Sequence, residues 1–325
     1  MNGEGRRVLL LGASGTIGLA VAGQLRADGY DPVCLMRADP LRDGCETQLA
    51  GIARLVTDFA DPSAVRQAIL RAGADALISC MASRTGAPED AWAIDYRAHS
   101  AVLKAAQAAR IRQMVLLSAI CVQKPRLAFQ RAKLAFEAEL IASGLTYSIV
   151  RPTAYFKSLS GQVARVRGGK SYLLFGDGRG TACKPISNRD LARYLVACLS
   201  DATLQNRVLP IGGPGPAVTP RAQGAYLFAK LGLTPRFRQV PVRLIRGIAS
   251  GLALAGRLSP AASRKAEFAR IAEYYATESM LVWDAVAERY DADATPEFGR
   301  ETLWDHYDHL LRGEGADDRG AHALF

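Results

Sequence analysis

The sequence lacks any uninterrupted apolar run of the roughly 18 residues that a membrane-spanning helix needs. No stretch near its start combines basic residues, an apolar segment and a small-residue cleavage site, so we expect no secretory signal. Internal repeats and low-complexity tracts are also missing. These absences favour a cytoplasmic globular protein, for which a hydrophobic content of 49% provides an ample core.

Paired cysteines and clustered histidines are absent as well. The six cysteines contain no C-x-x-C pair, which is typical of reduced thiols rather than of a disulfide framework or a zinc site. Of the four histidines, His306 and His309 are spaced to share one face of a helix. No third ligand accompanies them, so we expect no metal.

Positive charge is in excess, with 41 Lys and Arg against 31 Asp and Glu, a formal charge of +10. The arginines are spread along the chain, and no basic stripe alternates with aromatic residues. We therefore expect no nucleic-acid partner. An anionic small molecule or an anionic lipid surface remains compatible with this charge.

The first half of the chain alternates strand-like apolar runs with alanine-rich or leucine-rich helical patterns. This order predicts an α/β fold, a doubly wound parallel sheet of the Rossmann type with helices on both faces. The predicted strands span residues 6–12, 32–37, 53–57, 76–80, 113–118 and 146–151, and the predicted helices span 17–27, 62–72, 91–109 and 127–143.

After residue 151 the alternation loosens, which predicts a smaller and mostly helical substrate-side region. A predicted helix over 188–199 and a strand over 207–211 return to the sheet, and the pattern from Pro220 onward is mainly helical. We therefore expect a nucleotide-binding domain over 1–151, a substrate-side region over 152–313 and a flexible tail over 314–325.

The most informative motif is a glycine-patterned turn between the first strand and the first helix. Glycine allows a tight turn and lets backbone N–H groups approach a pyrophosphate, while the following helix directs its positive end at the same phosphates. The spacing G-x-x-G-x-x-G resembles that of extended and atypical short-chain dehydrogenases, and it predicts a dinucleotide site. The residues predicted to hold the cofactor here are Gly12, Ser14, Gly15, Thr16, Ile17 and Gly18.

Other strand ends indicate which dinucleotide binds. Arg37 ends the second predicted strand, where a guanidinium suits the 2′-phosphate of NADPH, and Asp39 follows beyond that strand. Asp58 follows the third strand and resembles the aspartate that contacts adenine in these families. The loop that begins at Cys80 is expected to pass under the nicotinamide ribose.

Ser118 and Lys133 occupy positions that carry catalysis in ordinary short-chain dehydrogenases. These enzymes add a tyrosine in a Y-x-x-x-K spacing, and its phenol exchanges the proton of a carbonyl or hydroxyl group. This chain has Phe129 at the tyrosine position. Lys133 still suits the ribose hydroxyls, whereas interconversion of alcohol and carbonyl by the usual tyrosine is disfavoured.

A more specific resemblance rests on several separated segments. They are LSAICVQKP (117–125), RPTAYFKSLSGQ (151–162), LFGDG (174–178), TACKPIS (181–187), DLA (190–192), ATESM (276–280) and GRETLWDHY (299–307). Together they resemble the NADPH-dependent divinyl chlorophyllide a 8-vinyl-reductases over nearly the whole chain. The resemblance implies reduction of the 8-vinyl group of 3,8-divinyl chlorophyllide to ethyl, in the synthesis of chlorophyll and bacteriochlorophyll.

The implied chemistry agrees with the missing tyrosine, because a vinyl group conjugated to a tetrapyrrole accepts hydride when the macrocycle delocalises the charge. The protein then has to align the vinyl group with the nicotinamide and exclude water. The other vinyl carbon needs a proton, for which Tyr155, Lys157 and a water held by Ser118 are candidates. We assign possible catalytic roles to Lys133, Ser118 and Tyr155.

A flat, mostly apolar pigment with one propionate group sets the expected substrate contacts. Lys157 and Lys184 lie in family-like segments and are candidates for the propionate, and Cys121, Tyr155 and Phe156 are candidates for the lining of the pocket. The apolar segment 242–258 carries arginines, so it either covers the pigment pocket or touches an anionic membrane surface peripherally.

Two other interpretations stay open on the same fold. One is an NADP-dependent reductase or isomerase of a different small ligand, and the other is a non-catalytic protein that senses NADPH or assists assembly. The fold alone does not separate these interpretations, and the sequence does not determine the oligomeric state.

Overall fold

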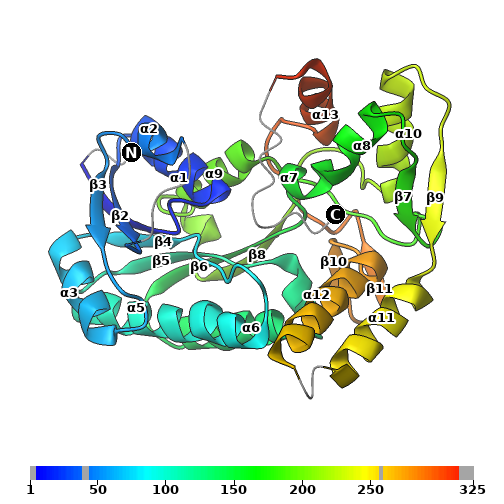
Figure 1. Ribbon diagram of the computed structural model, residues 1–325. Coiled ribbons are helices and arrows are strands. Elements are labelled where there is room, and N and C mark those ends of the chain that lie inside the picture. Colours follow the sequence, from blue (N-terminus) through cyan, green and yellow to red (C-terminus); the bar gives the residue numbers. More distant parts are fainter. Residues whose placement is uncertain (1–4, 39–43, 256–258, 315–325) are drawn as a thin grey trace.

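The computed structural model describes residues 5–38, 44–255 and 259–314, and its centre is a seven-stranded sheet (Figure 1). The strand order is β3-β2-β1-β4-β5-β6-β8, and all neighbouring pairs are parallel. The direction of winding changes between β1 and β4, so the doubly wound fold predicted from the sequence is confirmed. The strands are β1 (Arg7–Leu11), β2 (Asp31–Met36), β3 (Ala53–Val56), β4 (Ala76–Ser79), β5 (Gln113–Leu117), β6 (Thr146–Pro152) and β8 (Arg207–Ile211).

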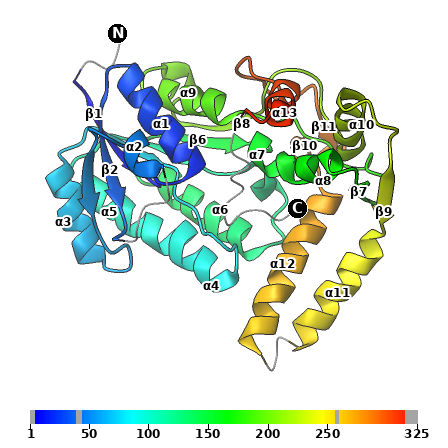
Figure 2. The same cartoon turned by 45° about the horizontal axis from the view of Figure 1, so that its top comes forward.

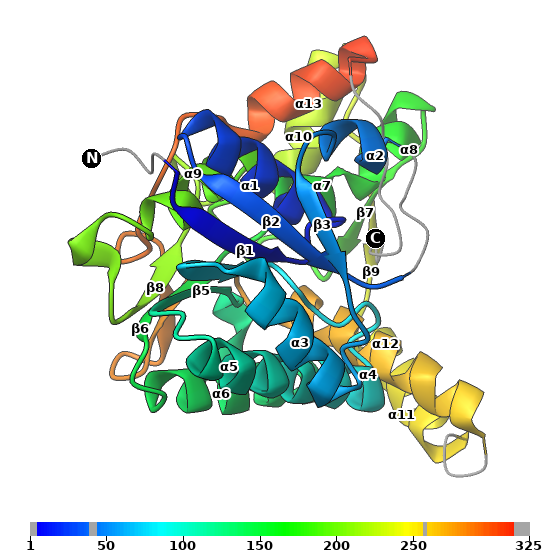
Figure 3. The ribbon, with the colours of Figure 1, turned by 90° about the vertical axis from the view of Figure 1, so that its left-hand side faces the viewer.

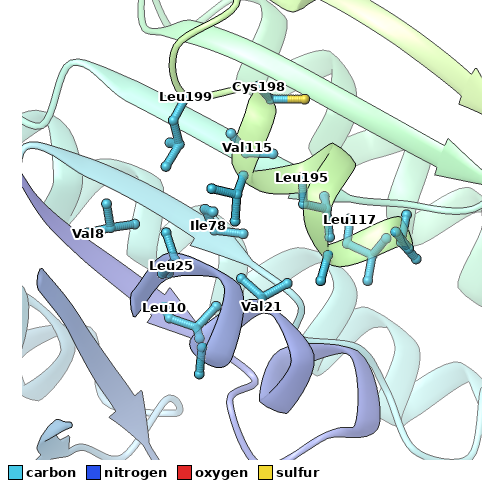
Figure 4. Packing of buried hydrophobic residues seen from close by; sticks show 14 of the residues in the cluster. Val8, Leu10, Val21, Leu25, Ile78, Val115, Leu117, Leu195, Cys198 and Leu199 are labelled. Carbon is cyan, nitrogen blue, oxygen red and sulfur yellow. The ribbon is translucent and has the colours of Figure 1, made fainter. Parts of the chain in front are cut away.

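Helices cover both faces of this sheet. On one face α1 and α9 pack together, and on the other lie α3, α5 and α6 (Figure 3). Successive strand side chains point to opposite faces, so Leu10 lies in one buried cluster with Val21 and Leu195 (Figure 4). Leu9 lies in the cluster on the other face, with Ile69. The helices are α1 (Thr16–Ala27), α3 (Pro62–Ala72), α5 (His99–Ala108), α6 (Ala128–Ile141) and α9 (Asn188–Ala197).

The predicted strands of this sheet are confirmed to within one residue at each end. A buried strand and the apolar run in its sequence begin and end at nearly the same residues. The predicted helix over 91–109 is more complex. It consists of α4 (Pro88–Ala91), a π-helical segment η1 (Trp92–Ala98) and α5. A π-helical segment is wider than an α-helix and often occurs at functional sites, and this one buries Asp95.

The second part of the molecule is smaller and contains strands that the helical pattern did not predict. Two four-residue strands pair in parallel, and two three-residue strands form an antiparallel hairpin. All four are too short to show an alternating apolar pattern, and three of them also contain arginine or aspartate. These strands are β7 (Tyr172–Phe175), β9 (Phe237–Val240), β10 (Val282–Asp284) and β11 (Arg289–Asp291).

Helices surround these short strands. The longest two, α11 and α12, form a hairpin that extends from the body of the molecule (Figure 2). Among the described residues, no helix is long and apolar enough to cross a membrane. The remaining helical segments are α2 (Cys45–Gln48), η2 (Ile120–Gln123), α7 (Phe156–Leu159), η3 (Ser160–Gln162), α8 (Val163–Arg167), η4 (Ala202–Leu204), α10 (Pro220–Lys230), α11 (Val242–Ala255), α12 (Pro260–Thr277) and α13 (Leu303–Arg312).

The C-terminal part of the described chain returns to the nucleotide-binding sheet. The buried carboxylate of Asp190 on α9 accepts hydrogen bonds from the N–H groups of Arg300 and Glu301, both at 3.0 Å. Burial alone would raise the pKa of Asp190, but these hydrogen bonds and the one from Arg193 lower it overall. Asp39, the end of segment 242–258 and nearly all of the predicted tail 314–325 lie outside the described residues.

Candidate active site

The glycine turn after β1 packs backbone against backbone. Gly12 has a φ of +76°, and a Cβ there would lie 2.6 Å from the carbonyl carbon of Cys80. A Cβ on Gly18 would lie 2.1 Å from the carbonyl oxygen of Gly12. Residues with side chains do not fit at these two positions, so the turn draws the start of α1 close to the end of β4.

The start of α1 is suited to bind phosphate. Its N-cap is Gly15, and no side chain caps the N-terminus, so the first N–H groups keep their hydrogen-bonding capacity for a ligand. The ammonium group of Lys157 reaches this point from α7 and donates to the hydroxyl of Thr16 at 3.0 Å. Backbone donors, a helix dipole and a cation therefore meet where a dinucleotide pyrophosphate is expected.

The predicted adenosine end of the site lies beside β2 and β3. Arg37 directly follows β2 and is exposed, which fits a contact with a 2′-phosphate. The carboxylate of Asp58 accepts a hydrogen bond from the N–H of Ala60 at 2.8 Å, so it also stabilises its own turn. Next to it, the buried hydroxyl of Thr57 has no hydrogen-bond partner among the described residues.

Lys133 is held in place by a carboxylate that the sequence analysis missed. Its Nζ lies 3.0 Å from Oδ1 of Asp95, whose side chain is fully buried. Asp95 also accepts a 2.6 Å hydrogen bond from the hydroxyl of Ser83, in the loop that begins at Cys80. The sequence separation of 38 residues hid this pair, and the π-helical turn brings Asp95 to it.

Ser118 belongs to a second buried polar network. Its hydroxyl donates to Glu137 on α6, and the same carboxylate binds the guanidinium of Arg151 at the end of β6. Glu137 lies four residues after Lys133, on the same face of α6. Because the Ser118 hydroxyl already donates to Glu137, this hydroxyl has only its acceptor capacity left for a water or a substrate.

Phe129 lies at the position of the usual catalytic tyrosine. Its ring is partly buried in a cluster that also contains Cys121, Ile271 and Tyr274. An aromatic ring without a hydroxyl at this position leaves the site without the ordinary proton donor.

Phenols and thiols gather instead around Cys121. Tyr155 follows β6 and is half-buried, and Tyr275 reaches in from α12 with its hydroxyl 3.8 Å from Sγ of Cys121. Burial, and then the negative charge that Cys80 and Cys121 would carry as thiolates, raise the pKa of Tyr155 above its ordinary value of 10.0. Burial likewise raises the pKa of Tyr275 well above that value. Both phenols therefore keep their protons at neutral pH.

The remaining predicted substrate contacts have partners inside the protein. The ammonium of Lys184 is buried and lies 2.5 Å from a carboxylate oxygen of Glu297, so contact with a propionate would have to share or replace this pair. Phe156 is buried with its ring 5.4 Å from that of His306. His306 in turn bonds to Ser160 at 3.0 Å, and the described parts of the chain hold no group of three metal-ligating side chains.

Comparisons with known proteins agree with this geometry. Residues 12–202 match the model of a family described as NAD(P)H-binding, so the chain binds a nicotinamide cofactor. The solved structure of the NADPH-dependent quinone oxidoreductase QOR2 from Escherichia coli with NADPH superposes with a TM-score of 0.68. The superposition covers 94% of this chain and 99% of the QOR2 chain at 19% sequence identity, so the two proteins share the fold.

Sequence relatives are more specific. The chain is 41% identical to a chloroplastic divinyl chlorophyllide a 8-vinyl-reductase of Cucumis sativus, over 100% of this chain and 81% of the relative. It is 43% identical to the protein of the same description from Oryza sativa subsp. indica, over 98% and 82%. Identity at this level over nearly all of this chain and about four fifths of each relative means that this protein belongs to the divinyl chlorophyllide a 8-vinyl-reductase family.

Proposed function

We propose that this protein uses NADPH to reduce the 8-vinyl group of 3,8-divinyl chlorophyllide a to an ethyl group. The observation that carries the proposal is identity of 41–43% over nearly the whole chain to relatives described as divinyl chlorophyllide a 8-vinyl-reductases. The substitution of Phe129 for the usual tyrosine supports it, because a conjugated vinyl group needs no acid at a carbonyl oxygen.

NADPH rather than NADH is the proposed cofactor, and when bound it supplies the hydride. The glycine turn and the start of α1 would hold its pyrophosphate, and Arg37 its 2′-phosphate. Lys133, fixed by Asp95, would hold the nicotinamide ribose. The contact between Lys157 and Thr16 favours a role for Lys157 at the cofactor phosphates, although the sequence assigned it to the substrate propionate.

Tyr155 is the proposed proton donor. The Ser118 hydroxyl donates to Glu137, and Lys157 bonds to Thr16 at the cofactor motif. For the hydroxyl of Tyr155, by contrast, no hydrogen-bond partner is found among the described residues. With hydride supplied to one vinyl carbon by the bound cofactor, the phenol of Tyr155 would protonate the other carbon, and the resulting phenolate would recover a proton from water. The neighbouring thiols of Cys80 and Cys121 are kept neutral by burial, which raises their pKa values.

The test is incubation of the pure protein with NADPH and divinyl chlorophyllide, followed by absorption in the blue band and by product mass. A gain of two hydrogens supports the proposal, and absence of tetrapyrrole turnover with intact NADPH binding contradicts it. For the proton donor, Tyr155→Phe should lower kcat by about 100-fold and leave NADPH affinity unchanged.

Tyr274→Phe is the matched control, because its hydroxyl only donates to the backbone carbonyls of Cys121 and Lys124. This variant should keep its kcat. Full activity in Tyr155→Phe would assign the proton to another group, and Tyr275→Phe is then the next variant to measure.

For the location, we propose the cytoplasm. All six cysteines are free thiols, and all but Cys80 are buried, which agrees with a reducing compartment. The plant relatives are described as chloroplastic.

A further inference from the structure

The hairpin of α11 and α12 has an inner and an outer helix (Figures 1 and 2). Ile271 and Tyr274 of α12 pack into the buried cluster around Cys121, beside the candidate active site. α11 packs on α12, where the guanidinium of Arg246 lies 2.8 Å from a carboxylate oxygen of Glu273. Segment 242–258 was expected either to cover the pocket or to touch a membrane surface. The helix beside the Cys121 cluster is α12, and α11 packs on the outer side of α12.

Apolar side chains are exposed on the outer surface of the hairpin. Leu244, Ile248 and Leu254 of α11 are 54%, 51% and 65% exposed, and Phe268 of α12 is 38% exposed. On α11, at about 100° of rotation per residue, Leu244, Ile248 and Leu254 fall within an arc of roughly 120° that is centred away from the buried Ile245 and Ala249. Large apolar side chains gathered on one projecting element indicate a contact surface rather than scattered exposure.

The exposed side chains of the hairpin are also positively charged. Arg243 on α11 and Arg264 and Lys265 on α12 are exposed, and within the described residues none of them has an ion-pair partner. The carboxylates of the hairpin are compensated, because Glu267 pairs with Arg270 and Glu273 pairs with Arg246. The exposed apolar groups of the hairpin are therefore accompanied by unpaired cations. On the described part of the hairpin, no exposed carboxylate is left unpaired.

We propose that this outer surface of the hairpin docks onto an anionic lipid bilayer, with α11 lying in the interface. Leucine and isoleucine side chains would enter the acyl boundary, and arginine and lysine would contact lipid phosphates. A second copy of this chain is disfavoured as the occupant, because the same cations would face one another. Docking there places α12, and with it the Cys121 cluster, next to the bilayer from which an apolar substrate arrives. The benefit of docking rests on the proposed function, whereas docking itself does not.

Sedimentation of the full-length protein with vesicles tests the proposal. Vesicles of phosphatidylcholine with phosphatidylglycerol should bind the protein, and vesicles of phosphatidylcholine alone should bind it at least about tenfold more weakly. The double variant Leu244→Asp/Ile248→Asp should lose binding by about tenfold or more, and the triple variant Arg243→Glu/Arg264→Glu/Lys265→Glu should lose it as well.

The matched control is Leu70→Asp/Ile141→Asp, which places the same charges at exposed apolar positions on α3 and α6. This control should bind vesicles like the unmodified protein, and all variants should bind NADPH normally, which shows that they fold. Turnover of detergent-dispersed pigment should be unchanged in the hairpin variants, which separates docking from catalysis. Three results would overturn the proposal: no binding to anionic vesicles, equal loss in the control, or a dimer in solution that Leu244→Asp/Ile248→Asp dissociates.

Discussion

At the scale of single residues, the site depends on charges that are buried in pairs. Asp95 is fully buried, and Lys133 and Ser83 satisfy its carboxylate. Removal of one member of such a pair leaves the other as an uncompensated charge in a medium of low dielectric constant. An exposed pair does not carry this penalty, because water replaces the lost partner.

We therefore expect Asp95→Asn to lower the free energy of unfolding by about 3 kcal/mol, because Lys133 stays buried without its counter-charge. Asp31→Asn removes the partner of Arg7 in a half-exposed pair and should cost less than about 1 kcal/mol. Urea unfolding followed by circular dichroism measures both. Equal losses in the two variants would mean that Lys133 finds another partner or solvent.

Arg37 gives a second expectation at this scale. Arg37→Ala should weaken NADPH binding by about tenfold to a hundredfold, the value of a charge-assisted hydrogen bond, and should leave NADH affinity unchanged. Titration calorimetry with both cofactors measures the ratio, with Arg71→Ala on α3 as the control. Equal loss for NADPH and NADH would contradict a 2′-phosphate contact.

At the scale of elements, the second part of the molecule is connected to the first by the segment before α13. Gly299 has a φ of +100°, and a Cβ on it would lie 2.1 Å from Cγ of the buried Asp190. This contact holds the segment against α9, where Asp190 accepts the N–H groups that follow Gly299. The segment therefore has no room for a side chain at this residue.

Gly299→Ala should destabilise the protein by more than backbone strain alone, which costs about 1–3 kcal/mol. Gly215→Ala isolates the strain, because Gly215 has a φ of +94° and open space around a Cβ. Thermal unfolding of the two variants gives the difference in their free energies of unfolding. We expect Gly215→Ala to be the more stable variant by more than about 1 kcal/mol. Identical melting temperatures would show that the segment moves away from α9 at no cost.

At the scale of the whole molecule, stability depends on a neutral histidine under the site. His99 is buried between the hydroxyl of Ser79 and the carbonyl of Ile94, each at 2.8 Å. The pKa of His99 is lowered from 6.5 to about 4, with burial as the largest cause; the Lys133 ammonium acts in the same direction, and the Ile94 carbonyl and Asp95 oppose the shift. Folding therefore disfavours the protonated ring.

Because the unfolded chain binds this proton more readily, the contribution of His99 is complete above pH 6.5 and is lost as the pH falls toward 4. The free energy of unfolding should decrease by up to about 1.4 kcal/mol per pH unit in this window. Urea unfolding at several pH values between 7.5 and 4.5 measures the slope, and His99→Gln should flatten it. An unchanged slope in the variant would assign the pH dependence to other groups.

Much of the fold and part of the candidate site follow from local sequence patterns. Buried runs such as Arg7–Leu11 and the glycine turn after it predicted the strands, their parallel order and the dinucleotide motif. These patterns are local because burial on a sheet and a tight turn each leave a signature within a few residues. The position of Arg37 after the second strand was predictable for the same reason.

The amino-acid sequence by itself determined the doubly wound sheet, the glycine turn and the absence of a phenol at Phe129, since each is set by residues that are neighbours along the chain. Only the tertiary structure decided which polar groups meet. It paired Asp95 with Lys133 and brought Tyr275 to Cys121, across 154 residues of sequence. Such contacts depend on how helices pack over a sheet, and a single buried carboxylate or phenol leaves no periodic signal in the sequence.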